Sequence, residues 1–306
     1  MPVVDIRAAR AAVQETLSSK LFFPVRIMPL LGVNPNNHNE HFPAPFMQAV
    51  TGIPNTSLNE NSPEIILGVH GPVYKLVENE TAFRAVDEAI IQSDINCEEM
   101  SFEDTLLNGG RQAIRTYRFP AVTQLIIPNT LVELELRVVN SYDGTLKFGY
   151  ISSAILQGSS IGMTFRQGRM QSFGKHTTNI DIDLIIRRLN LVVDQFNTET
   201  EAWKAFHTYS CSESDFEHLL EEMTQINDDL KRHLKHKFRN LSSLNGQTFW
   251  CAYLTLCQWT NDERTIALAY RSNTEGIRLN REKQIRKVFN STRWRHLHQG
   301  ASFIND

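Results

Sequence analysis

One stretch of 24 residues, VELELRVVNSYDGTLKFGYISSAI at 132–155, constrains the fold most strongly. Apolar and polar side chains alternate along its first half, which is the period of a strand with one buried and one exposed face. Leu134, Leu136 and Val138 would face the interior, and Glu133, Glu135 and Arg137 would face solvent. Tyr142-Asp143-Gly144 follows where a turn is needed, and Asp-Gly tolerates the positive φ of such turns. The stretch therefore predicts a β-hairpin that is covered on one side.

The neighbouring sequence supplies elements that would cover it. Apolar spacing predicts a strand from Ile65, a helix over 81–95 and another strand over 111–119. A further glycine-rich hairpin or loop spans 158–174. A long helix is expected to begin near Thr178, with Thr178 or Asn179 as its cap and with a buried stripe at helical spacing: Ile182, Ile185, Leu189, Val192 and Phe196.

The two ends of the chain differ in character. A capping box at Ser214–Glu217 and apolar helical spacing over 248–259 and 279–297 predict helices throughout the C-terminal part. A short amphipathic helix is expected over 5–19, and the Pro/Asn-rich residues 23–46 are expected to form a loop. Whether residues 24–63 form an arm that is exchanged between subunits stays open.

Together these elements predict an α+β fold. We expect a small antiparallel sheet with a basic hairpin and a long packing helix, followed by a helical C-terminal half. The expected regions are an N-terminal helix and Pro/Asn-rich arm over 1–64, an α+β core over 65–207 and a helical C-terminal region over 208–306.

Composition argues against membrane, exported and disulfide-rich classes. No apolar run reaches the roughly 18 residues of a membrane span, and the N-terminal residues lack the apolar segment of an export signal. The four cysteines are scattered and form no C-x-x-C pair, so we expect free thiols in a reducing cytoplasm. Cys251 and Cys257, six residues apart in an apolar helical stretch, are expected to be buried.

The formal net charge of −3 hides an uneven distribution of charge along the chain. Between Glu64 and Asp104 there are ten acidic residues and two basic ones, whereas between Arg111 and His176 there are eight basic residues and three acidic ones. Residues 278–295 form a second basic zone. The placement of these charges says more about partners than the net charge does.

The basic loop GRMQSFGKHT at 168–177 admits several chemical interpretations. A Walker loop is excluded because five residues instead of four separate Gly168 from Gly174, and because His176 follows Lys175 where Ser or Thr is required. Neither a metal-ligand spacing nor a G-x-S-x-G motif occurs, so we predict no metal, no cofactor and no catalytic residue. Nucleic-acid binding remains, since cations bind phosphates and aromatic faces stack on unpaired bases.

The predicted nucleic-acid site joins this loop to cations that precede it. Phosphate contacts are expected from Arg166, Arg169, Lys175 and His176, extended by Arg111, Arg115 and Lys147, and stacking contacts from Phe165 and Phe173. An alternative stays open, in which the phenylalanines belong to the core and the charges lie at its rim.

Three motifs occur in an order that is similar to that of a known family. They are Asn140-Ser141-Tyr142-Asp143-Gly144, Gly162-Met163 and Lys175-His176-Thr177. The chain resembles, over roughly 68–295, the phage- and plasmid-encoded proteins called domain of unknown function 932. The resemblance implies a mobile-element origin and a bacterial host cytoplasm, and it brings no activity with it. The order of elements is also similar to the core of ring-forming single-strand annealing proteins, which bind DNA in a basic groove through backbone contacts.

Two functions of different classes follow as hypotheses. The first is a phage or plasmid DNA-metabolism protein that binds single-stranded DNA as a homo-oligomer, without covalent chemistry, in annealing or recombination. The second is an inhibitor that binds a host protein of defence or replication through the acidic 64–104 segment. A nuclease that uses Asp143 with His176 is a third hypothesis. No membrane partner is predicted for any of them.

Overall fold

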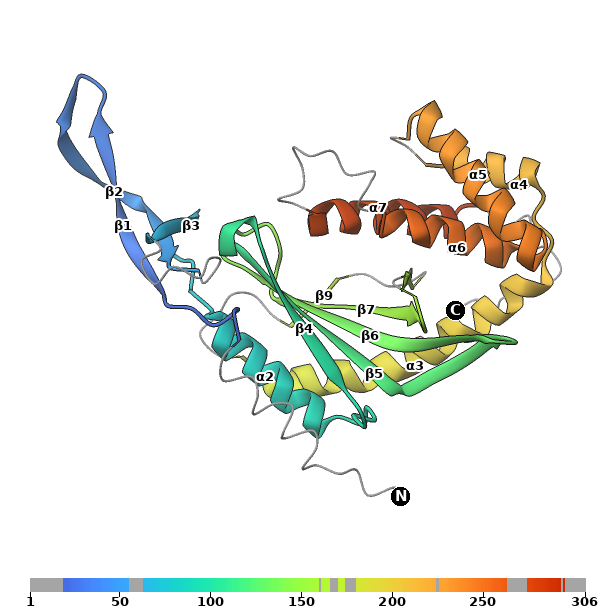
Figure 1. Ribbon diagram of the computed structural model, residues 1–306. Coiled ribbons are helices and arrows are strands. Elements are labelled where there is room, and N and C mark those ends of the chain that lie inside the picture. The colour runs from blue at the N-terminus through green and yellow to red at the C-terminus, as the bar shows by residue number, and fades with distance from the viewer. Residues whose placement is uncertain are drawn as a thin grey trace. The chain divides into compact units, whose positions relative to one another are not determined.

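The computed structural model describes residues 19–54, 63–159, 161–165, 170–173, 180–223, 226–262, 274–292 and 294 (Figure 1). Over these residues it contains two antiparallel sheets and six helices, which confirms the predicted α+β class. The chain divides into two compact units that interleave along the sequence. Unit 1 comprises Met1–Ala121, Leu136–Ile151 and Met170–Leu191, and unit 2 comprises Val122–Glu135, Ser152–Arg169 and Val192–Asp306. This division differs from the three consecutive regions expected from the sequence, which stay a prediction.

The first sheet lies in unit 1 and has three strands in the order β1-β2-β3 (Figure 1). A long hairpin of β1 (Val25–Asn34) and β2 (Asn37–Gly52) is joined by β3 (Ile65–His70). The prediction of a loop over 23–46 is therefore wrong. Pro29 lies on β1, which is an edge strand, and Pro43 lies in the part of β2 that β3 does not reach. Neither proline therefore lies in a strand segment that is paired on both sides, where its missing N–H would cost a hydrogen bond.

The second sheet has the order β4-β5-β6-β7-β8, with β9 also paired to β7. Its longer strands are β4 (Ser101–Leu107), β5 (Gln112–Ile127), β6 (Thr130–Ser141) and β7 (Gly149–Leu156), and a 3-10 turn (Asn108–Gly110) joins β4 to β5. The predicted hairpin over 132–155 is confirmed as β6 and β7. The short strands β8 (Gly162–Thr164) and β9 (Gln171–Ser172) each pair with β7, so of the hairpin or loop expected over 158–174 the hairpin is not formed by these two strands.

The polar face predicted for β6 is wrong. Leu134, Leu136 and Val138 are fully buried, as expected, but Glu135 and Arg137 on the opposite face are only 4% and 1% exposed. In unit 2, Glu135 accepts a hydrogen bond from the hydroxyl of Ser153 at 3.1 Å. Both faces of this strand are therefore covered, and its charged side chains have to be satisfied inside the protein.

Six helices complete the described residues: α2 (Asn79–Gln92), α3 (Ile182–Thr208), α4 (Glu213–Glu221), α5 (Asp228–Asn245), α6 (Phe249–Thr260) and α7 (Thr274–Phe289). The long helix α3 begins close to its predicted position, and four of the five predicted stripe residues are fully buried: Ile185, Leu189, Val192 and Phe196. It contacts the second sheet in each unit. Tyr150 donates to the carbonyl oxygen of Arg188 in unit 1, and Phe165 packs against Phe196 in unit 2.

Two helix starts differ from the predicted caps. Thr178 and Asn179 lie outside the described residues, and Asp181 accepts a hydrogen bond from the N–H of Leu184 at 2.8 Å. The predicted capping box at Ser214 is instead formed by Ser212 with Asp215, two residues earlier. Both corrections reflect the same physics, because any short polar side chain at the first turn can satisfy a free N–H.

The predicted burial of Cys251 and Cys257 is confirmed, and Cys97 and Cys211 are buried as well; all four cysteines are free. Eleven of the twelve residues of α6 are buried, so its apolar composition is explained by packing inside unit 2. None of the helices in the described part of the chain combines the length and the apolar character that crossing a bilayer requires.

Candidate nucleic-acid interface

The loop Tyr142–Lys147 joins β6 to β7 in unit 1 and lies within one of the basic segments of the sequence. Tyr142 anchors it, since this side chain is 1% exposed and its hydroxyl accepts the N–H of Asn79 at 2.9 Å. The N–H of Tyr142 donates to the carbonyl oxygen of Arg111 at 2.7 Å. Asp143 accepts the N–H of Thr145 at 3.0 Å, and Gly144 has φ 73°, where a side chain would be strained. Tertiary contacts and turn chemistry therefore hold this loop in one shape.

Strand β3 lies directly against the loop. A Cβ atom at Gly68 would overlap the carbonyl oxygen of Tyr142, so only glycine allows the two backbones to approach this closely. Nε2 of His70 donates to the same carbonyl oxygen at 2.5 Å, and its ring stacks on Tyr74 with centroids 3.8 Å apart. Burial, followed by the charge of Asp143, raises the pKa of Tyr74 to about 12. The phenol therefore stays protonated at physiological pH.

Three exposed cations lie in this loop or in segments whose residues contact it or follow directly on such a contact. Arg111 reaches the carbonyl oxygen of Ile66 at 3.4 Å and stays exposed, Lys75 follows Tyr74, and Lys147 ends the loop. Exposed lysine and arginine side chains on a fixed backbone suit phosphate groups, because they lose little hydration before contact and release counterions on binding. The arrangement therefore suits an anionic backbone.

Of the predicted site residues, Arg111 and Lys147 are exposed, as a binding role requires. Arg115 is not available and has to be removed from the predicted site. Its side chain is fully buried, and its guanidinium binds Asp104 at 2.7 Å and Asp87 at 2.8 Å. The hydroxyl of Tyr117 donates to Asp87 at 2.6 Å. Burial raises the pKa of Asp87 and that of Tyr117, so this cluster is an internal ion-pair group that joins α2 to β4 and β5.

Phe165 and Phe173 are also core residues and not stacking platforms. Phe165 is 2% exposed and packs in unit 2 against Phe196 and Trp203. Phe173 is 4% exposed and packs in unit 1 against Phe148 and Tyr150. The alternative that assigned these rings to the core is the correct one, because neither ring presents a face to a base.

The remaining predicted contacts, Arg166, Arg169, Lys175 and His176, lie outside the described residues. The nuclease hypothesis needs His176 and therefore stays a prediction, while Asp143 is used by its own turn. Among the residues that the structure describes, no three His, Cys, Asp or Glu side chains come together as a metal site.

In its described part, 278–292, the second basic zone is less basic at the surface than its sequence indicates. Arg281 is 7% exposed, and Arg278 and Arg286 lie within 3.4–3.7 Å of the buried carboxylate of Glu282. Lys283 and Lys287 remain exposed on α7. The arginines of this helix therefore serve packing within unit 2, and its lysines face solvent.

The acidic segment is likewise divided between the interior and the surface. Asp87 and Asp104 pair with Arg115, and Glu64 pairs with Arg26 at 2.5 Å. The exposed acidic residues that remain include Glu78, Glu88, Asp94, Glu98, Glu99 and Glu103. An acidic surface therefore persists on and after α2 in unit 1.

Sequence reasoning missed His70, Tyr74 and Lys75 as neighbours of the loop. Lys75 was visible only as one of two cations in an acidic segment, and it follows Tyr74, which stacks on His70 of β3. The close approach of Gly68 to Tyr142 brings this segment to the loop across more than 70 residues of sequence. No local pattern signals such a contact.

The fold and the loop define an α+β protein with two antiparallel sheets and a basic surface loop that carries the Asn-Ser-Tyr-Asp-Gly motif. The chain belongs to the family described as Domain of unknown function (DUF932), which it matches over residues 66–286. No curated protein and no solved structure matches it.

Proposed function

We propose that this protein binds single-stranded DNA through the basic surface around the Tyr142–Lys147 loop and acts as a homo-oligomer in phage or plasmid DNA metabolism in the host cytoplasm. The observation that carries the proposal is that Arg111, whose carbonyl oxygen binds the loop at Tyr142, and Lys147, which ends the loop, are both exposed in unit 1. Contacts of this kind are made to phosphates and carry no base preference. Annealing or recombination would follow from such binding, since both require strands that are held by their backbones.

The oligomeric part of the proposal rests on the β1–β2 hairpin, which we call the arm. Beyond the reach of β3, the arm is a two-stranded ribbon whose apolar side chains are exposed, among them Leu31 at 57%, Phe42 at 53% and Phe46 at 77%. A two-stranded hairpin alone is marginally stable in water, and a large exposed apolar patch marks an interaction site. The arm is therefore expected to be covered in the assembled protein.

A second copy of this chain is the occupant that fits the arm. The arm has only two carboxylate or cationic residues, Arg26 and Glu40; Arg26 pairs with Glu64, and Glu40 accepts a hydrogen bond from Asn34. A DNA-binding surface would need unpaired cations on the arm. An apolar surface with few charges is instead suited to pack against the same surface of a second copy. Exposed apolar side chains recur along all three strands of this sheet, among them Ile27, Leu31, Phe42, Phe46 and Ile66, as expected of a surface that is covered in an assembly.

The test uses charge removal with a matched control in the other unit. The double variant Arg111→Gln/Lys147→Gln is compared with Lys283→Gln/Lys287→Gln by fluorescence anisotropy on a labelled single strand and its duplex over a salt series. Each lost phosphate contact lowers the salt slope by about 0.7 on single strands, so the loop variant should lose about 1.4 and bind all sequences more weakly. The control should keep the slope of the wild type. An unchanged slope in the loop variant would refute this site, and absence of binding by the wild type at low salt would refute the function.

The exposed acidic surface favours a second candidate, a protein-binding inhibitor of host defence or replication. Glu88 of α2 and the residues Asp94, Glu98, Glu99 and Glu103 place negative charge at the surface of unit 1. Such a surface resembles the charge of DNA to a basic host protein. Glu98→Gln/Glu99→Gln should then weaken capture of a host DNA-binding protein and leave binding to the labelled single strand unchanged, whereas capture that survives the double variant would argue against this candidate.

A further inference from the structure

Two contacts fix the imidazole of His70, the last residue of β3, beside the loop of unit 1 that begins at Tyr142. Nε2 of His70 donates to the carbonyl oxygen of Tyr142 at 2.5 Å, and the ring of Tyr74 stacks on the imidazole with centroids 3.8 Å apart. The opposite edge of the imidazole lies next to Gly144, where a Cβ atom would be 3.4 Å from Cε1 and 3.9 Å from Nδ1 of His70. The orientation of both ring nitrogens is therefore set by the fold.

These contacts decide which nitrogen of His70 can take up a proton. A carbonyl oxygen only accepts hydrogen bonds, so Nε2 carries the proton of the neutral ring and Nδ1 carries the lone pair. Nδ1 makes no hydrogen bond within the described part of the chain, and it does not belong to the buried polar atoms that lack a partner there. Solvent therefore reaches Nδ1, and an anionic ligand can reach it as well.

The titratable and charged groups around this ring leave a place for an anion. Tyr74 is a protonated phenol, and Gln48 of β2, which pairs with His70, is neutral. Asp143 is the only carboxylate of the loop, and hydrogen bonds within its own turn already engage it. The exposed Lys75, next to Tyr74, adds positive charge. Within the described residues no carboxylate pairs with His70, so a phosphate group can take that place.

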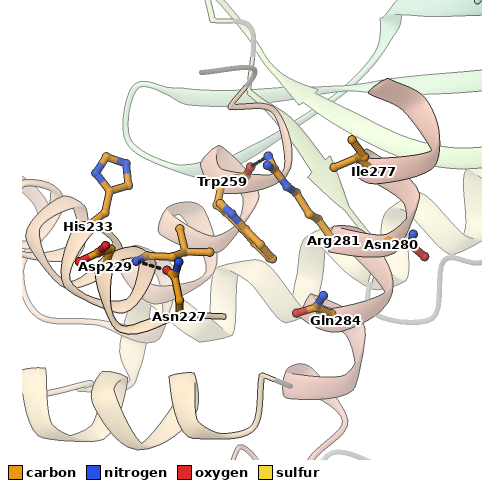
Figure 2. A pocket seen from close by; sticks show the side chains of 9 residues that line it. Asn227, Asp229, His233, Trp259, Ile277, Asn280, Arg281 and Gln284 are labelled. Atoms are coloured by element: carbon orange, nitrogen blue, oxygen red, sulfur yellow. Dashed lines mark hydrogen bonds between the residues drawn. The ribbon is translucent and has the colours of Figure 1, made fainter. Parts of the chain in front are cut away.

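A histidine of unit 2 shows the opposite arrangement. His233 of α5 is one of the side chains around a pocket that Trp259 and Arg281 also line (Figure 2). Nε2 of His233 lies 3.7 Å from Oδ2 of Asp262, a carboxylate oxygen that also binds Nζ of Lys237 at 3.0 Å. A proton on His233 is therefore matched by a carboxylate inside unit 2, which makes this residue a control for His70.

We propose that His70 is a further phosphate-binding residue of the DNA surface and that it makes this contact only in its protonated form. The proton taken up at Nδ1 supplies the N–H that a phosphate oxygen accepts, while Nε2 keeps its hydrogen bond to the loop. Histidine changes its charge between about pH 5 and 8, so the affinity for single-stranded DNA rises as the pH falls. By linkage, DNA binding promotes proton uptake. This inference rests on the proposed function of the loop.

The test is fluorescence anisotropy of a labelled single strand with the full-length protein, over a salt series at about pH 8 and at about pH 5.5. For the wild type, the lower pH should raise the affinity about fivefold at a fixed salt concentration and steepen the salt slope by about 0.7, the value of one phosphate contact. His70→Gln keeps an N–H donor for the carbonyl oxygen of Tyr142 but takes up no proton, so both changes should disappear. His233→Gln is the matched control and should retain both.

The results separate this inference from the proposed function. Equal salt slopes of the wild type at the two pH values, or changes that persist in His70→Gln, would overturn the inference and leave the DNA surface in place. Absence of binding by the wild type at both pH values in low salt would refute the proposed function and this inference with it. If His70→Gln fails to fold, nitrogen NMR of the wild-type imidazoles decides. Both nitrogens of His70 should carry a proton in the DNA complex at the lower pH, and an unprotonated Nδ1 would contradict the inference.

Discussion

Two antiparallel strand pairs in unit 1 treat their side chains in opposite ways. In the pair β4–β5, Arg115 is fully buried with its carboxylate partners, whereas in the arm Leu31, Phe42 and Phe46 are more than half exposed. Helix α2 explains the difference, since it covers one face of β5 and brings Asp87 to Arg115, while among the residues that the structure describes no helix has been found to cover the outer arm. In these two strand pairs, the elements that pack on a strand decide which side chains are buried. A buried charged side chain then needs partners of opposite charge inside the protein.

The largest effect is expected from removing the buried cation. Arg115→Met leaves Asp87 and Asp104 in the interior without their counter-charge, and should lower the free energy of unfolding by about 3–5 kcal/mol. Urea denaturation followed by circular dichroism measures this loss. Arg111→Met removes an exposed arginine four residues away and should cost less than about 1 kcal/mol. Equal losses of unfolding free energy in the two variants would contradict the claim that the buried arginine stabilises the fold more than the exposed one.

A smaller loss is expected from the hydroxyl of the same cluster. Tyr117→Phe removes a donor to the buried carboxylate of Asp87 and should cost about 1.5–3 kcal/mol, the range of hydrogen bonds to charged groups. Tyr150→Phe is the matched control, because its hydroxyl donates at 3.3 Å to a neutral carbonyl oxygen and should cost about 0.5–1.5 kcal/mol. The same urea titration compares them. If Tyr150→Phe were the more costly, the charged cluster would not be the stronger element.

Substitutions in the arm should weaken the association of subunits and leave the stability of each subunit nearly unchanged. Leu31→Ser/Phe46→Ser removes exposed apolar surface, so the free energy of unfolding of one subunit should change by less than about 0.5 kcal/mol, while the dissociation constant of the oligomer should rise at least about tenfold. Light scattering after size exclusion over a range of concentrations gives the second quantity. Leu191→Ser/Leu244→Ser alters exposed leucines on α3 and α5 and should leave the oligomer intact. An oligomer that survives the arm variant would reassign the interface.

The smallest effect is expected from the ion pair at the base of the arm. Hydrogen bonds from Arg26 and Thr51 lower the pKa of Glu64 from 4.5 to about 2. Because the folded-state pKa is the lower one, the stabilisation is complete above pH 4.5 and is lost as the pH falls through about 2. Solvent screens this exposed pair, so the change is small. A carbon-detected NMR titration of the Glu64 carboxyl measures it, with Glu88 for comparison, and a Glu64 pKa near 4.5 would contradict the pairing.

The sequence predicted the parts of this fold that depend on local periodicity. The hairpin over 132–155, the stripe of α3 and the buried helix at 249–260 were all visible, because strand and helix periods are short-range signals. The arm was not visible, since the Pro and Asn residues of 29–45 have the composition of a loop and become a hairpin only through their pairing register.

The predicted site shows the same limit. Arg111 and Lys147 were identified as cations and lie at the surface, but Arg115 has the same chemistry and lies inside. Strand alternation would place Arg111 and Arg115, four residues apart, on the same side, so the pattern does not distinguish them. Arg115 is buried because it lies in β5 against Asp87 of α2, whereas Arg111 precedes the strand. Phe165 and Phe173 are buried although they lie in a basic segment, and Glu135 and Arg137 of β6 are buried although they are charged. In both cases the packing around the strand decides the burial, and the local sequence does not show it.

Gly68 has a consequence for how this protein can vary. The carbonyl oxygen of Tyr142 occupies the place of a side chain at this position, and the loop that begins at Tyr142 carries the exposed lysine at 147. Every codon change that replaces this glycine adds at least a Cβ, so no single replacement keeps the carbonyl where it is. Substitutions at position 68 are therefore expected to be selected against, even though glycine has no reactive side chain. In a deep mutational scan, position 68 should tolerate no substitution, whereas its neighbours in β3 should tolerate several.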